Sequence, residues 1–136
     1  MDISVEVTVN APVEKVWAAW TTPEQIVNWN FASDDWHCPK AELELHEGGR
    51  FSYRMEATDG TAGFDFQGTF KTLELQKLVR YIIDDEREVT VQFLASGNSV
   101  LVKETFQAEK IHTEEQQRQG WQSILNNFKR YVENSA

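Results

Sequence analysis

One long amphipathic helix near the C-terminus, preceded by a run of short strand patterns, most constrains the fold of this chain. Thr113-Glu114-Glu115-Gln116 is a capping box, in which the Thr and Gln side chains satisfy N–H groups at a helix start. The pattern then continues to about Glu133, and its apolar stripe has helical spacing: Trp121, Ile124, Leu125, Phe128 and Val132. Roughly twenty residues at ~1.5 Å each give a helix of roughly 30 Å, the width of a small domain. We therefore predict that this helix covers a whole sheet.

The middle of the chain consists of short segments in which apolar and polar residues alternate. A period of two is typical of half-buried strands, and turns such as Asp59-Gly60 and Ser96-Gly97-Asn98 separate the segments. The pattern slips near Leu73 and Leu75, which indicates a bulge or a strand end. Consecutive strands joined by hairpin turns predict an antiparallel sheet of about six strands before the long helix.

A first strand and two short helices precede that sheet. Residues 3–9 alternate as a strand, and an apolar helical face follows at Val13, Val16, Trp17 and Trp20. Thr22-Pro23-Glu24-Gln25 is predicted to open the second helix with a capping box. Residues 30–40 are predicted to form an irregular polar-aromatic loop.

Size and charge restrict the class of protein. The 136 residues suit a single domain, and no apolar stretch is long enough to span a bilayer. A net charge of −9 repels phosphate backbones and anionic lipid surfaces, so we expect neither nucleic acid nor membrane as a partner. The first residues do not form a signal peptide, and the single cysteine, Cys38, excludes an intrachain disulfide. These features predict a cytoplasmic protein.

Patterns typical of metal and nucleotide sites are missing from the sequence. His37, His46 and His112 lie far apart, whereas a metal site needs three or four converging ligands. Gly48-Gly49 is interpreted as a turn rather than a phosphate-binding loop, and no GxSxG motif occurs. We therefore predict no metal and no cofactor.

Two residues are candidates for acid–base chemistry. By alternation Glu104 shares the covered face with Phe106, where burial would raise its pKa and allow it to bind or protonate a ligand. The alternative is a bulge or a strand end that turns Glu104 to water. His37 lies beside Trp36 and Cys38 in the expected loop and could supply a proton acceptor at a cavity rim. The alternative is a solvated loop in which Trp36 covers the domain edge.

Aromatic residues at inward-facing positions predict a cavity. One helix does not fill a concave sheet completely, and an aromatic pocket with a few polar groups is the usual ligand site. Tyr53 and Tyr81 would supply such groups, unless their hydroxyls pair with each other or with Glu104. The alternative is that these aromatics form an ordinary core. The predicted cavity residues are Trp29, Trp36, Phe51, Tyr53, Met55, Phe64, Phe66, Tyr81, Phe93, Glu104, Trp121, Leu125 and Phe128.

Several motifs resemble one known family along essentially the whole chain. They are Val9-Asn10-Ala11-Pro12-Val13-Glu14-Lys15-Val16-Trp17, Trp20-Thr21-Thr22-Pro23-Glu24, Gly48-Gly49-Arg50-Phe51, Gly68-Thr69-Phe70 and Gln119-Gly120-Trp121-Gln122-Ser123-Ile124-Leu125-Asn126-Asn127-Phe128. The chain resembles the activator of heat-shock protein 90 ATPase homologue (AHSA) family of the START-like (SRPBCC), helix-grip superfamily. The resemblance implies one domain over residues 1–136 with an α+β, Bet v-like fold, in which a curved antiparallel sheet wraps a long C-terminal helix.

The resemblance implies a cavity for a small apolar molecule in many relatives and a chaperone-regulating, stress-response role in a few. The chaperone activators carry a separate N-terminal domain for which this sequence has no counterpart. We therefore expect binding of a small hydrophobic or aromatic ligand for sequestration, sensing or carriage. The alternatives are a lyase, cyclase or hydrolase that uses Glu104 or His37 in the same cavity, and a protein-interaction domain with a chaperone partner. The binding and enzyme hypotheses differ in whether a carboxylate or an imidazole reaches the cavity.

Overall fold

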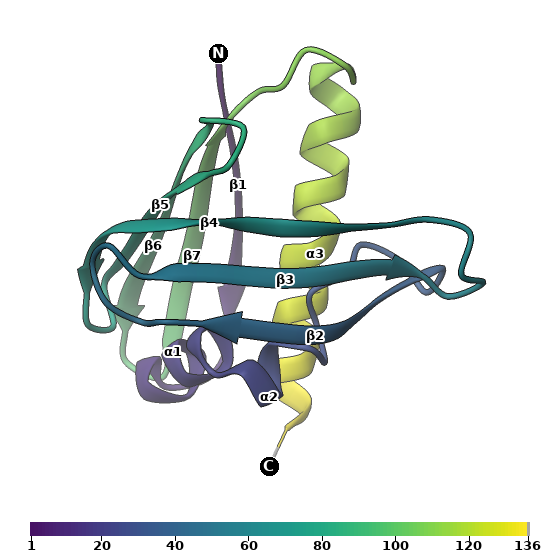
Figure 1. Ribbon diagram of the computed structural model, residues 1–136. Coiled ribbons are helices and arrows are strands. Elements are labelled where there is room, and N and C mark those ends of the chain that lie inside the picture. Colours follow the sequence, from purple (N-terminus) through teal and green to yellow (C-terminus); the bar gives the residue numbers. More distant parts are fainter. Residues whose placement is uncertain (136) are drawn as a thin grey trace.

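The long helix and the antiparallel sheet expected from the sequence are both present in the computed structural model, which describes residues 1–135 (Figure 1). In chain order the elements are β1 (Asp2–Val9), α1 (Val13–Thr21), α2 (Pro23–Ile26), β2 (Trp36–Leu43), β3 (Arg50–Ala57), β4 (Gly63–Glu74), β5 (Leu78–Ile83), β6 (Glu88–Ser96), β7 (Ser99–Gln107) and α3 (Glu114–Asn134). Within these residues no helix combines the length and the apolar character needed to cross a membrane.

The sheet is strongly curled. Its seven strands lie in the order β1-β7-β6-β5-β4-β3-β2, and every neighbouring pair is antiparallel. Figure 1 shows β2, β3 and β4 running across the direction of β1 and β7. The register between β4 and β5 shifts between Phe70 and Thr72, close to where the apolar pattern slips, and such a bulge increases the local bend and twist. The bend makes one face of the sheet concave.

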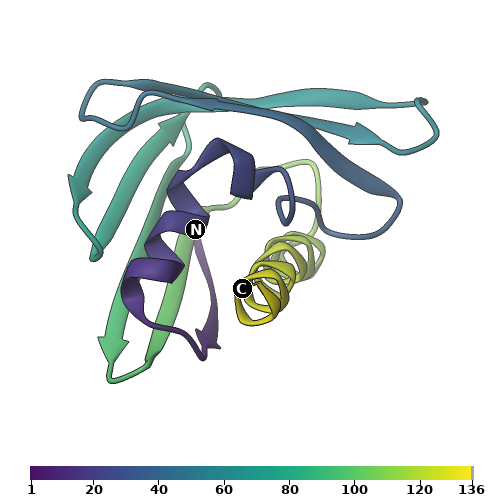
Figure 2. The same cartoon turned by 90° about the horizontal axis from the view of Figure 1, so that it is seen from below.

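Helix α3 lies on the concave side of the sheet, beside β1, as the end-on view in Figure 2 shows. The predicted capping box is confirmed, because Thr113 Oγ1 accepts from the Gln116 N–H and Gln116 Oε1 accepts from the Thr113 N–H. Leu125 and Phe128 are fully buried, as their place in the apolar stripe predicts. The short helices α1 and α2 cover the end of the sheet near the C-terminal end of α3 (Figure 1).

Aromatic packing joins α1 and the turn after α2 to α3. The Phe128 ring lies edge-on to Trp20 and Trp29, with ring centroids 5.0 and 4.7 Å away. Trp29 Nε1 donates to the Ala19 carbonyl at 3.0 Å, and Asn127 Nδ2 donates to the Trp29 carbonyl at 2.8 Å. The first hydrogen bond fixes the orientation of the Trp29 ring, which also lines the cavity described below, and the second ties the Trp29 backbone to α3.

Two local predictions are wrong. Strand β2 begins at Trp36, inside the segment expected to be an irregular loop, and its residues pair with β3. A register shift between His37 and Lys40 disguises the alternation, and Pro39, which cannot donate to the ladder, is tolerated because β2 is an edge strand. The Thr22 side chain makes no capping hydrogen bond, and the Gln25 side chain accepts from the Tyr131 hydroxyl of α3 instead.

Candidate functional site

A cavity of about 320 Å³ lies on the concave face, between the sheet and α3. Alternation along β3 and β4 directs their aromatic and apolar side chains toward it. Helix α3 contributes Trp121, whose ring stacks on Phe106 of β7 at a centroid distance of 4.0 Å. The walls are therefore mainly apolar, with a small number of polar groups.

Most of the residues proposed for the cavity from the sequence line it in the structure. These are Trp29, Phe51, Tyr53, Met55, Phe64, Phe66, Tyr81, Glu104 and Trp121. Phe64 is 50% exposed and lies near the start of β4.

Four residues proposed for the cavity lie elsewhere. Phe93 packs edge-on against Trp17 at 5.2 Å, because α1 covers that part of β6. Leu125 and Phe128 are fully buried in the core. The Trp36 ring lies against the Phe64 ring, with the two centroids 5.9 Å apart, but Trp36 is not part of the cavity wall.

Several other wall residues were not among those proposed from the sequence. Leu43, Leu45, Phe70, Val79 and Ile124 are apolar and share the alternation or helical stripe of predicted neighbours, so that pattern was the available signal. Arg87 and Glu109 lie outside regular strands, in the turn before β6 and the segment before α3. The curl of the sheet brings them to the cavity, and a single sequence carries no signal for that.

Glu104 lies in the middle of β7 and is only 5% exposed. Its register partners are Val5 on β1 and Val91 on β6, so apolar strands flank it on both sides. Burial raises the pKa of the Glu104 carboxyl from 4.5 to about 8. Within residues 1–135 its carboxyl oxygens take part in no side-chain or backbone hydrogen bond, and because no side-chain oxygen sealed from water lacks a partner there, these oxygens are open to the cavity. Since β7 pairs with β1 and β6 without a register shift, the bulge and strand-end alternatives are both wrong. Glu104 therefore presents a neutral carboxyl to the cavity at neutral pH.

Tyr53 and Tyr81 also present hydroxyls to the cavity, from β3 and β5. Burial raises the pKa of both phenols, and the nearby Glu104 raises that of Tyr81 further. In the part of the chain that the structure describes, neither hydroxyl is hydrogen-bonded to the other, to Glu104 or to another group, and both are open to the cavity rather than sealed from water. The pairing considered as an alternative is thus not formed.

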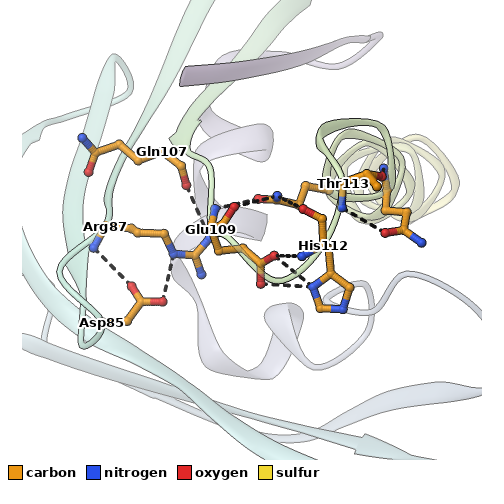
Figure 3. Close-up of polar contacts among 8 residues, drawn as sticks. Asp85, Arg87, Gln107, Glu109, His112 and Thr113 are labelled. Carbon is orange, nitrogen blue, oxygen red and sulfur yellow. Dashed lines mark hydrogen bonds and ion pairs between the residues drawn. The ribbon is translucent and has the colours of Figure 1, made fainter. Parts of the chain in front are cut away.

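Polar contacts hold the chain where Arg87 and Glu109 reach the cavity (Figure 3). Arg87 Nε donates to Asp85 Oδ2 at 2.9 Å, and Arg87 Nη1 donates to the Gln107 carbonyl at 3.4 Å. The backbone N–H of His112 donates to the Glu109 carboxylate, and this hydrogen bond lowers the Glu109 pKa. Both side chains are therefore engaged with neighbours at the edge of the cavity.

His37 and Cys38 of β2 differ in orientation. The His37 side chain is exposed and lies 3.7 Å from Glu56, outside the cavity wall. Cys38 is buried, and its thiol donates to the Lys40 carbonyl at 3.5 Å. Burial raises the Cys38 pKa to about 11, which keeps the thiol protonated and poorly nucleophilic. The structure therefore does not bring His37 to Glu104 as a second acid–base group.

The expectation that no metal binds stays a prediction. Within residues 1–135 no three His, Cys, Asp or Glu side chains converge as ligands. Elemental analysis of the purified protein should therefore show no stoichiometric transition metal. About one zinc or iron per chain, lost when His37 and Cys38 are both replaced by Ala, would contradict this expectation.

Comparisons with known proteins give the family. An AHSA1-like protein from Aeromonas hydrophila, known from its solution structure, is 50% identical; the comparison covers 98% of this chain and 92% of that chain with a TM-score of 0.92. The protein Chr148 from Cytophaga hutchinsonii is 43% identical over 98% of this chain and 92% of that chain, with a TM-score of 0.85. No curated protein matches the chain.

More distant structures share the fold alone. A protein from Chromobacterium violaceum is 20% identical, with a TM-score of 0.87 over 99% of both chains. The predicted α+β helix-grip fold is thereby confirmed. Residues 10–133 match the family described as Activator of Hsp90 ATPase homolog 1-like protein. The chain therefore belongs to this AHSA1-like family, within the START-like group of helix-grip proteins.

Proposed function

We propose that the protein binds a small, largely aromatic or hydrophobic molecule in this cavity, in order to sequester, sense or carry it. The cavity of about 320 Å³ is the observation that carries the proposal. An apolar cavity of about 150 Å³ is large enough to bind benzene. A cavity of roughly twice that volume fits a ligand of about two fused rings, and it falls within the size range of small-molecule sites.

Two effects make the free energy of binding favourable: new dispersion contacts, and the small cost of desolvating the protein. Aromatic side chains that face an empty volume lack contacts on one side, and a ligand of matching shape restores them. The ligand leaves water for a mainly apolar surface, which favours binding. Membership of the AHSA1-like family is consistent with ligand-binding and with chaperone-related roles, and it specifies no ligand.

The enzyme alternative has partial support, because the Glu104 carboxyl reaches the cavity and the His37 imidazole does not. Acid–base catalysis commonly needs a second positioned group, and His37 lies outside the cavity wall. The ionisable groups in the wall besides Glu104 are Tyr53, Tyr81, Arg87 and Glu109. Recovery of a bound molecule with unchanged mass after prolonged incubation would support binding over catalysis, and a product of different mass would support catalysis.

A thermal-shift screen with lipids, isoprenoids and polycyclic aromatics tests the proposal. A ligand at a hundredfold excess over its dissociation constant should add about 2.7 kcal/mol to the free energy of unfolding. It should also quench the fluorescence of Trp121, which lines the cavity.

A matched pair of variants ties the effect to the cavity. Ile124→Trp adds an indole to the wall and should abolish the shift, because less volume remains. Leu94→Trp makes a comparable enlargement at an exposed position outside this cavity and should retain the shift. A shift that survives Ile124→Trp, or no shift with any compound, would refute the proposal and favour an interaction domain.

A further inference from the structure

Three polar groups that reach the cavity from different strands share an unusual property. The Glu104 carboxyl on β7 and the Tyr81 and Tyr53 hydroxyls on β5 and β3 have no hydrogen-bond partner among residues 1–135, and they keep access to water through the cavity. A polar group that is withdrawn from water without a partner costs free energy. A molecule that enters this cavity and displaces water must therefore form hydrogen bonds with these groups, or its binding is weakened by that free-energy cost.

The charged groups around Glu104 determine which protonation state of its carboxyl a ligand meets. Val5 of β1 and Val91 of β6 flank it and cannot titrate, and α3 presents Trp121. The titratable groups on the remaining elements are Tyr81 on β5, Tyr53 on β3, Cys38 on β2, and Arg87 and Glu109 at the cavity edge.

None of these groups supplies a free cation beside Glu104. Arg87 is paired with Asp85, and Glu109 is an anion held by His112. The carboxyl is therefore neutral at pH 7, in agreement with its raised pKa of about 8. The carboxylic acid and the two phenols then offer three O–H donors to the cavity.

This arrangement distinguishes between ligand classes. An ammonium group would require ionised Glu104 and would place two charges in an apolar cavity, where desolvation opposes the pair. A carboxylate would bring a charge to a cavity whose Arg87 is already engaged. A hydrocarbon would leave the donors unsatisfied. An uncharged carbonyl oxygen accepts such hydrogen bonds and carries no net charge.

We propose that the ligand is an uncharged planar molecule with a carbonyl-type acceptor oxygen at one end, and that this oxygen is seated against Glu104 and Tyr81. The inference rests on the proposed function and adds the chemical class of the ligand. Tyr53 lies close enough to Tyr81 to affect its pKa and belongs to the same polar end of the cavity.

Two naphthalene probes test the proposal. 2-Acetylnaphthalene carries the acceptor, and 2-ethylnaphthalene has a similar shape without it. Since the hydrocarbon is intrinsically more hydrophobic, the measured quantity is the ratio of the two dissociation constants in each variant. Glu104→Met removes the donor, and Glu104→Gln keeps an N–H donor. Loss of one buried hydrogen bond should raise the ketone-to-hydrocarbon ratio about tenfold in Glu104→Met. The ratio in Glu104→Gln should stay close to that of the wild type.

The dependence of ketone binding on pH gives a second readout. If only the protonated carboxyl binds the ketone, its dissociation constant should rise about tenfold between pH 7 and pH 9 in the wild type. Glu104→Gln should show a flat profile, because its amide does not titrate. Tyr53 and Tyr81 stay protonated over this interval, since burial raises both pKa values.

The possible outcomes separate this inference from the proposed function. If both probes bind with a ratio that is equal in wild type, Glu104→Gln and Glu104→Met, the acceptor class is overturned while the cavity remains a binding site. Tighter binding of 1-(2-naphthyl)ethylamine than of the ketone, increasing from pH 7 to pH 9, would overturn it in favour of a cation. If neither neutral probe binds the folded wild-type protein, the proposed function fails and this inference fails with it.

Discussion

Replacement of Phe128 by alanine should lower the free energy of unfolding by about 3–5 kcal/mol, as expected for a fully buried phenylalanine. The ring is 0% exposed and lies edge-on to both Trp20 and Trp29, so its removal leaves a cavity where α3 meets α1 and the turn after α2. Urea unfolding monitored by tryptophan fluorescence measures the loss.

Phe64→Ala provides the matched control for this prediction. It removes the same ring from a position that is 50% exposed, so the loss should be much smaller. Equal losses in the two variants would contradict the packing of α3 described above.

Glu104→Gln should be more stable than the wild type at alkaline pH, by an amount that grows to about 5 kcal/mol. Folding raises the Glu104 pKa from 4.5 to about 8, so the folded state binds more protons than the unfolded state between these values. The wild-type stability contributed by the protonated group is complete below about pH 4.5 and is lost as the pH rises through about 8. Each pKa unit corresponds to about 1.4 kcal/mol. The glutamine does not titrate and escapes this loss.

Unfolding free energies of both proteins should be measured from pH 5 to pH 9 and subtracted at each pH. The subtraction cancels the pH dependence contributed by groups whose folded-state pKa is lowered, such as Asp84 beside Arg50 and Glu133 beside Asn10. Glu6→Gln, at an exposed position on β1, should leave the wild-type pH dependence unchanged. A difference between Glu104→Gln and wild type that stays constant over the whole range would show that the buried carboxyl is ionised in the folded state.

Elements with regular local patterns could be predicted from the sequence. The extent of α3 and the cap at Thr113 follow from a continuous helical stripe and a four-residue motif. The inward orientation of Glu104 follows from strict alternation along β7, whose pairing with β1 and β6 has no register shift. Strand β2 was missed because the register shift after His37 interrupts its alternation.

The composition of the cavity depends on curvature, which a single sequence does not specify. Tyr81 and Phe93 both face inward from neighbouring strands, but α1 covers Phe93 and leaves Tyr81 beside the cavity. Arg87 and Glu109 reach the cavity edge from separate connecting segments. Their approach depends on the pairing of β6 with β7 and on the path into α3, which are long-range features.

The pairing of β1 with β7 has a consequence for the order of folding. Ser4 and Thr105 hydrogen-bond across this pair although 101 positions separate them along the chain. Closing so large a loop costs entropy before the contacts form, and topologies dominated by distant pairings fold slowly. During synthesis β1 leaves the ribosome before β7, and its hydrogen-bonding edge lacks its partner strand until β7 has also emerged. Glu104 itself lies on β7, so the cavity that it lines cannot be assembled before most of the polypeptide has been made.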